Sequence, residues 1–268
     1  TIVSIVLFSS SLGIDALTLG VAVGNLGVLG LFVGRLALFT RGARAASPDV
    51  PSVGSRGGWF VLWGAAATVL FGELVYAGVT LTERSLASRL PPGSIAAFFY
   101  ASTIVSVPLA LFIVPLTAMA FPGMVEAFRR DIRAGLAQIS KYGIFLSAAS
   151  VAVVLIVVPF AQTIVETVFL RGQFSTGHAA VTASILSVTI VALPFMSLSR
   201  LLRNACYALS DYRTPVAGLF VQLAALVGLG SVLVPRYGAP GLAVAMVAGE
   251  AVLLSTMALV LIRRVRAQ

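Results

Sequence analysis

Five polar residues recur within one otherwise apolar stretch of the sequence: Glu73, Tyr76, Thr80, Glu83 and Arg84. At about 100° per residue they fall within roughly a third of a helix circumference. Ionisable side chains inside an apolar segment mark pathways, binding sites or paired contacts, because burying charge is costly. We therefore interpret this stripe as one wall of a cavity. The alternative interpretation places Glu83 and Arg84 at the segment's outer end and leaves only Glu73 truly buried.

A second isolated carboxylate, Glu250, lies near the middle of the last apolar stretch, beside Gly249. A carboxylate in such surroundings is able to bind a proton, bind a cation or pair with an arginine. It is equally able to serve as a protonated packing residue held by a hydrogen bond. We treat Glu250 as a candidate for ion coupling, and we place Glu166 nearer the outer end of its helix.

A basic group occupies the inner end of another apolar stretch, where Arg200, Arg203, Asn204 and Tyr207 share one helix face. Such a face is able to hold an anionic phosphate by charge-assisted hydrogen bonds. The plainer interpretation is that the arginines anchor the helix at the membrane surface. The following turn, Asp211 to Pro215, predicts a helix start with Thr214 as the N-cap.

Signatures of catalysis and of cofactor binding are absent from the sequence. We find no Walker A loop, GxSxG, HExxH or GxGxxG motif. One cysteine, Cys206, and one histidine, His178, build neither a disulfide framework nor a Cys/His metal site. We therefore expect no enzyme, no catalytic residue, no metal and no cofactor.

The amino-acid composition indicates which kind of secondary structure holds these polar residues in place. Hydrophobic residues make up 59% of the 268 residues, charged residues 10%, and the mean hydropathy is +1.05. Ordinary soluble domains are roughly 45–50% apolar and about 25% charged. The sequence thus predicts an all-α polytopic membrane protein, and its net charge of +9 reflects loop orientation, not nucleic-acid binding.

Apolar runs long enough for a bilayer about 30 Å thick set the number of expected helices. Residues 1–9 resemble the end of a truncated span, and the chain, which starts at Thr1, is expected to be a piece of a longer one. Seven full spans are predicted at 12–34, 59–82, 95–121, 142–170, 178–199, 214–234 and 239–262.

Basic residues alternate between the loops that these spans define. Fourteen lie in one set of loops and four in the other. The rich set is Arg35, Arg41, Arg44, Arg56, Arg129, Arg130, Arg133, Lys141, Arg200, Arg203, Arg213, Arg263, Arg264 and Arg266; the poor set is Arg84, Arg89, Arg171 and Arg236. The positive-inside rule puts the rich loops and the C-terminus of this chain in the cytoplasm.

Five sequence segments carry a resemblance to a known family. They are TERSLASRLPPGS (82–94), GSIAAFFYA (93–101), FPGMVEAF (121–128), RGQFSTGHAAVTASIL (171–186) and YALSDYRTPV (207–216). Their order and spacing are similar to those of the MurJ/MviN family, the lipid II flippases of the MATE-like multidrug/oligosaccharidyl-lipid/polysaccharide exporter superfamily. YALSDYRTP together with RGQFS is the most specific combination.

The resemblance implies a fold and a division of the chain. Residues 1–35 would end a first lobe, residues 36–58, rich in Pro, Gly and Ser, would form a cytoplasmic inter-lobe loop, and residues 59–268 would form a second six-helix lobe. It implies export of an undecaprenyl-pyrophosphate-linked disaccharide-pentapeptide across the bacterial cytoplasmic membrane. The implied partners are this lipid-linked glycan, membrane lipids and the missing first lobe, with no nucleic acid.

Two departures from the family pattern concern the site. Many members have YADRL where this chain has YASTI (100–104), so Thr103 stands where those members have a cavity arginine. Arg84 is the candidate to take over the role of that arginine. The sodium ligands of some members are also missing, since the corresponding segments are AALVGLGSVLVP (224–235) and GLAVAMV (241–247). The expected substrate-binding residues are Glu73, Tyr76, Thr80, Glu83, Arg84, Tyr100, Thr103, Arg203 and Asn204.

Three other functions remain open at this stage. A flippase for another polyprenyl-linked polysaccharide would explain better than a lipid II flippase why Thr103 stands in place of the family's cavity arginine. A cation-coupled MATE-type drug exporter would use an acidic, aromatic cavity, which Glu73 and Tyr76 fit in part, although the YALSDYRTP loop argues against it. A scaffold for cell-wall assembly that does not transport would tolerate substitution of Glu73, Arg84 and Glu250.

Overall fold

The structure, a computed structural model, describes residues 56–170 and 175–266. Over these ranges the chain is helical, with no strand. The helices are α3 (Arg56–Ala87), α4 (Ser94–Pro108), α5 (Val114–Arg130), α6 (Ile132–Phe169), α7 (Thr176–Thr189), α8 (Leu193–Ala208) and α9 (Arg213–Arg266). A π-helical segment, Leu109–Ile113, joins α4 to α5, and a 3-10 turn, Ile190–Ala192, joins α7 to α8.

Four continuous helical stretches are long and apolar enough to cross a membrane. They are Ser94–Arg130, Ile132–Phe169, Thr176–Ala208 and Arg213–Arg264. The expected all-α, multi-pass architecture is confirmed, and the six spans predicted between residues 59 and 262 all coincide with helices. The spans predicted at 1–9 and 12–34, and the loop up to residue 55, lie outside the described residues.

The helices extend further than the predicted spans. The third span, expected at 95–121, continues to Arg130, and α6 begins at Ile132 instead of 142. Likewise α3 begins at Arg56, before the expected start at 59. Hydropathy marks only the part of a helix that faces lipid, whereas backbone hydrogen bonds continue past that part into water. Arg129, Arg130, Arg133 and Lys141 therefore stand on helices and not in a loop.

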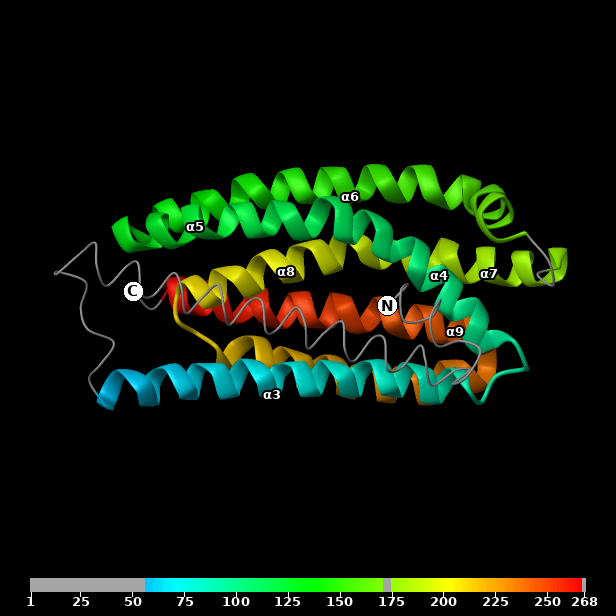
Figure 1. The fold of residues 1–268 in the computed structure, drawn as a ribbon, viewed down its shortest axis with the longest axis horizontal. Helices are drawn as coiled ribbons and strands as arrows, with labels where there is room; N and C mark the ends of the chain where they lie inside the picture. Colours follow the sequence, from blue (N-terminus) through cyan, green and yellow to red (C-terminus); the bar gives the residue numbers. More distant parts are fainter. Residues whose placement is uncertain (1–55, 171–174, 267–268) are drawn as a thin grey trace, which may run out of the picture. The chain divides into compact units, whose positions relative to one another are not determined.

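The described residues from Phe60 onward form one compact unit of the chain. Within it α6 packs against α5, α7 and α8, while α4 packs against α7, and α8 against α9. Figure 1 shows α5 beside α6 and α8 beside α9. Ser150 on α6 and Ser197 on α8, both buried, share a hydrogen bond of 3.1 Å, so these helices are joined by a polar contact inside an apolar core.

The helix labelled α9 contains a sharp reversal at Gly238, where φ is +61°. Glycine has no Cβ and adopts this conformation without strain. At Gly241 a Cβ would overlap the carbonyl oxygen of Leu233, so the turn also requires glycine there. The reversal separates the two spans predicted at 214–234 and 239–262 and brings them against each other, since one buried cluster contains both Leu219 and Leu253.

Helix α3 packs on the first half of α9. The Phe71 and Phe220 rings lie 5.9 Å apart between centroids, and a Cβ at Gly72 would lie 3.2 Å from Val216. Further along, Leu86 contacts α9 at Gly230, where an added Cβ would lie 2.6 Å from a Leu86 methyl group. These contacts fix the rotation of α3, and therefore the direction in which its polar stripe points.

Candidate functional site

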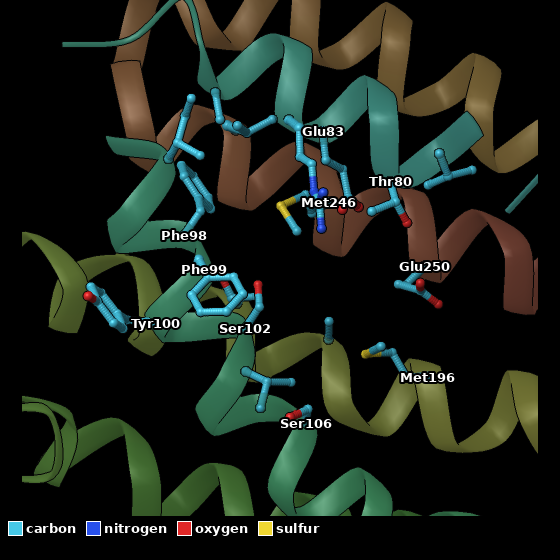
Figure 2. Close-up of a pocket in the computed structure, with 18 of the residues that line it drawn as sticks. Thr80, Glu83, Phe98, Phe99, Tyr100, Ser102, Ser106, Met196, Met246 and Glu250 are labelled. Atoms are coloured by element: carbon cyan, nitrogen blue, oxygen red, sulfur yellow. The ribbon is translucent and has the colours of Figure 1, made fainter. Parts of the chain in front are cut away.

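A cavity of about 830 Å³ lies between α3, α4, α8 and the second half of α9. Figure 2 shows Thr80 and Glu83 of α3, Met246 and Glu250 of α9, and Phe98, Phe99, Ser102 and Ser106 of α4 around it. Most of the lining is apolar, with a few polar and charged side chains. Cavities of this size with few polar groups are typical of ligand sites.

Six of the ten residues predicted from the sequence line this cavity. Four come from the stripe on α3, one from α4 and one from α9: Tyr76, Thr80, Glu83, Arg84, Tyr100 and Glu250. The structure thus brings together Glu83 and Glu250, which are far apart in the sequence. Within the lining as the described residues define it, Arg84 is the only basic side chain.

The other four predicted residues lie elsewhere. Glu73 is exposed on α3 and does not line the cavity. It lies closer to the start of the helix than the other four residues of the stripe. Thr103 is also exposed outside the lining, and its hydroxyl donates to the Phe99 carbonyl at 2.8 Å. Arg203 and Asn204 likewise stand outside the described lining. The structure therefore does not place Thr103 at the cavity wall.

Asn204 instead joins two helices. Its side-chain amide donates to the Thr117 carbonyl on α5 at 3.0 Å. Arg203, its neighbour, has a buried Nε without a hydrogen-bond partner among the described residues. Arg200 and Arg203 are close enough to Tyr76 and Glu250 for their charges to interact. Positive charge on α8 therefore acts on the carboxylate that lines the cavity, although neither arginine lines it.

Gln222 is a polar residue that the sequence analysis missed. It lies on the first half of α9, is only 3% exposed, and its Nε2 donates to Glu250 Oε1 at 2.8 Å. A lone amide inside the apolar span 214–234 was the available signal. Nothing in the sequence linked it to Glu250, because only the reversal at Gly238 brings the two halves of α9 together.

The turn before α9 is held by an aspartate and not by the predicted threonine. Asp211 accepts hydrogen bonds from the backbone N–H groups of Arg213 and Thr214 and from the Thr214 hydroxyl. It also pairs with Arg264 near the end of α9, at 3.0 Å. Thr214 therefore lies inside the helix, and the N-cap prediction was wrong. The Asp211 carboxylate, and not the Thr214 hydroxyl, accepts from the free N–H groups at the start of α9.

Comparison with known proteins places this geometry in a family. The family model described as "Lipid II flippase MurJ" matches residues 1–268. A probable lipid II flippase MurJ of Bdellovibrio bacteriovorus is 30% identical over 166 residues, which cover 61% of this chain and 31% of that protein. A probable lipid II flippase MurJ of Thermotoga maritima is 27% identical over 166 residues, covering 62% of this chain and 34% of that protein. The chain spans about a third of the length of these relatives.

Solved structures show the same fold. A structure described as lipid II flippase MurJ in an inward closed conformation aligns with a TM-score of 0.64 at 17% identity, covering 72% of this chain and 40% of that one. A mutant of the Vibrio cholerae MATE transporter VcmN aligns with a TM-score of 0.78 at 16% identity, covering 98% of this chain and 59% of that one. The fold is therefore that of the MATE-like transporters.

Proposed function

This chain belongs to the lipid II flippase MurJ family, and from that premise we propose that the complete protein exports a lipid-linked peptidoglycan precursor. The proposed substrate is undecaprenyl pyrophosphate carrying a disaccharide-pentapeptide, moved across the bacterial cytoplasmic membrane by alternating access. Export of this kind makes and breaks no covalent bond, so we assign no catalytic residue and no cofactor.

The observation that carries this proposal is the cavity of about 830 Å³ within a lobe of a flippase family. Its walls combine apolar residues with the hydroxyls of Tyr76 and Thr80 and the guanidinium of Arg84. An amphipathic lipid with a sugar and pyrophosphate head needs both kinds of surface. Arginine is suited to the head because its fork of N–H donors matches phosphate oxygens.

We propose that Tyr76, Thr80, Glu83, Arg84 and Tyr100 contact the head group in this lobe, and that Glu250 couples transport to an ion. Glu73, Thr103, Arg203 and Asn204 lie outside the described lining of the cavity. For these four we propose no direct contact with substrate inside this lobe.

The proposed division of the chain keeps residues 1–35 as the end of a first lobe, 36–58 as a cytoplasmic inter-lobe loop and 59–268 as the second lobe. Alternating access around a central site requires two lobes that move against each other. The first lobe is therefore the proposed partner of this chain, together with membrane lipids. The arginine-rich helix ends and the C-terminus of this chain are proposed to face the cytoplasm.

The test uses the full-length gene in a bacterium depleted of its own lipid II flippase. Membrane insertion is verified first, and growth and the exposure of lipid II in the outer leaflet are then measured. We expect both to be restored by the full-length protein and neither by residues 59–268 alone. A well-inserted full-length protein that restores neither would overturn lipid II as the substrate.

A further inference from the structure

The pair formed by Gln222 and Glu250 lies at the edge of the cavity. Glu250 lines the cavity, while Gln222 behind it is 3% exposed, and their side chains are joined at 2.8 Å. The carboxyl group of Glu250 therefore has the cavity on one side and a fixed amide on the other. Figure 2 shows Glu250 on α9, on the same side of the cavity as Thr80.

Only one of the two polar atoms of the Gln222 amide forms a described hydrogen bond. Its Nε2 donates to Glu250, whereas its Oε1 is buried and has no hydrogen-bond partner among the residues that the structure describes. An amide offers two donors on nitrogen and an acceptor on oxygen, and rotation by about 180° exchanges them. Gln222 is consequently able to donate to a carboxylate and, after rotation, to accept from a protonated carboxyl group.

Charged and titratable groups of both signs surround this carboxyl group. Helix α3 contributes Tyr76, Glu83 and Arg84 to the same cavity, and α8 places Arg200 and Arg203 within electrostatic reach of Glu250. Helix α4 contributes Tyr100 and no charged side chain to the described lining. Glu250 is thus neither locked in an ion pair nor isolated from charge.

From this geometry we infer that Glu250 is a proton-binding site and that Gln222 is the positioning residue that holds both of its protonation states. A hydronium ion in the cavity water gives its proton to a Glu250 oxygen and leaves a water molecule. The carboxylate loses its charge, and the Gln222 amide turns from donor to acceptor. Release reverses each step. The use of this proton in transport rests on the proposed function, but its binding does not.

The chain contains a matched pair that serves as a control. Gln162 Nε2 donates to Glu166 Oε1 one helical turn away on α6, but Gln162 is exposed and the pair lies outside the described cavity lining. That pair therefore has a similar Gln–Glu contact without a buried amide. A buried amide at a cavity wall, and not merely a Gln–Glu contact, is what the inference requires.

Infrared difference spectroscopy of the full-length protein in lipid vesicles, between low and high pH, measures protonated carboxyl groups directly. We expect a carboxyl band that is lost in Glu250→Gln, shifted in frequency in Gln222→Leu because its hydrogen-bond partner is gone, and unchanged in Glu166→Gln. Glu250→Asp keeps the carboxyl group but moves it away from Gln222, so it must also shift the band. An unshifted band in Gln222→Leu and Glu250→Asp, or one that survives Glu250→Gln, overturns the inference.

Two further measurements, addition of sodium and an assay of lipid II export, distinguish failure of the proton-binding inference from failure of the proposed function. Loss of the band on adding sodium at constant pH would show a metal cation at Glu250 and overturn the proton assignment. Export of lipid II by a protein without a Glu250 band would remove the inference and leave the proposed function. A Glu250 band in a protein that exports no lipid II would remove only the proposed function.

Discussion

Arg84 and Asn204 show that a polar residue on a membrane helix has a role set by what its side chain reaches. Arg84 lines the cavity, where no other basic side chain stands in the described lining, and forms no described ion pair. Asn204 was predicted to bind substrate with it, yet its amide is used in a contact between α8 and α5. The two residues should therefore respond differently to truncation.

Replacing Arg84 by alanine is expected to reduce lipid II export at least tenfold while leaving the membrane level of the full-length protein unchanged. A charge-assisted hydrogen bond contributes about 1.5–3 kcal/mol, and about 1.4 kcal/mol corresponds to a factor of ten. Arg89→Ala is the control, because Arg89 is exposed in the turn after α3 and does not line the described cavity. Normal export by a well-expressed Arg84→Ala variant would remove Arg84 from the site.

Replacing Asn204 by alanine is expected to lower stability by about 0.6 kcal/mol, the mean for hydrogen bonds between membrane helices, while export continues. Thermal unfolding of the detergent-solubilised protein measures the first effect, and the depletion assay measures the second. Ser255→Ala is the control, because among the described residues the Ser255 hydroxyl bonds only to the Ala251 carbonyl of its own helix. A loss of export at unchanged stability would place Asn204 among the substrate contacts after all.

At the scale of elements, the two halves of α9 depend on a close backbone approach at their turn. The reversal uses Gly238 in a left-handed conformation, and Gly241 leaves no space for a Cβ beside the Leu233 carbonyl. Because the Gln222–Glu250 pair joins the same two halves, this turn also positions the proton-binding residue. A change at the turn therefore acts on the site from a distance.

Gly241→Ala is expected to destabilise the protein by about 1–3 kcal/mol, the usual effect of forcing extra atoms into a packed site. Gly228→Ala is the matched control, because a Cβ at Gly228 meets nothing within 4 Å. Alanine favours a helix over glycine by about 0.5–1 kcal/mol, so this control should be neutral or stabilising. Equal melting temperatures for the two variants would contradict the tight turn.

Helix α4 is joined to α5 by a second irregular element. Pro108 ends α4 without an N–H donor, and the π-helical segment Leu109–Ile113 follows it. Proline removes a helix hydrogen bond, and in the π-helical segment that follows it the hydrogen bonds join residues five apart. Since Leu109 lines the cavity, this irregularity shapes the wall opposite α3.

At the scale of the whole molecule, the structure describes a multi-pass membrane protein whose membrane orientation rests on the distribution of basic residues. The helix ends near Asp131, and the turn at Asp211 between α8 and α9, carry Arg and Lys on their flanks. The turns after α3 and at Gly238 carry Arg89 and Arg236. The first group is therefore expected inside and the second outside.

Thiol labelling of intact cells tests this orientation, with every native cysteine of the full-length protein, including the buried Cys206, replaced by alanine. A cysteine in place of Ser88 or Tyr237, both exposed, is expected to react with a membrane-impermeant reagent. A cysteine in place of Asp131, also exposed, is expected to react only after the membrane is permeabilised. The reverse pattern would place the C-terminus of the chain outside.

The sequence alone determined that the chain lies in a lipid bilayer, that it is helical, and to which family it belongs. Apolar runs and alternating basic residues arise from the bilayer itself, which requires about 20 apolar residues per span and retains positive loops inside. Helix periodicity also placed five polar residues on one face of α3, because neighbours on one helix face are fixed by the 3.6-residue repeat. Four of them, all but Glu73, line the cavity. The length of a span and the face of a helix depend only on residues close together in the chain.

Only the tertiary structure decided which polar residues meet. Thr103 lies outside the cavity lining because packing sets the rotation of α4, and Glu73 lies outside it because the cavity does not extend that far along α3. A polar stripe does not reveal what it faces. Gln222 and Glu250 meet because the reversal at Gly238 aligns two spans, and sequence periodicity cannot relate one span to the next. The ion pair of Asp211 with Arg264 likewise joins residues that are far apart in the sequence.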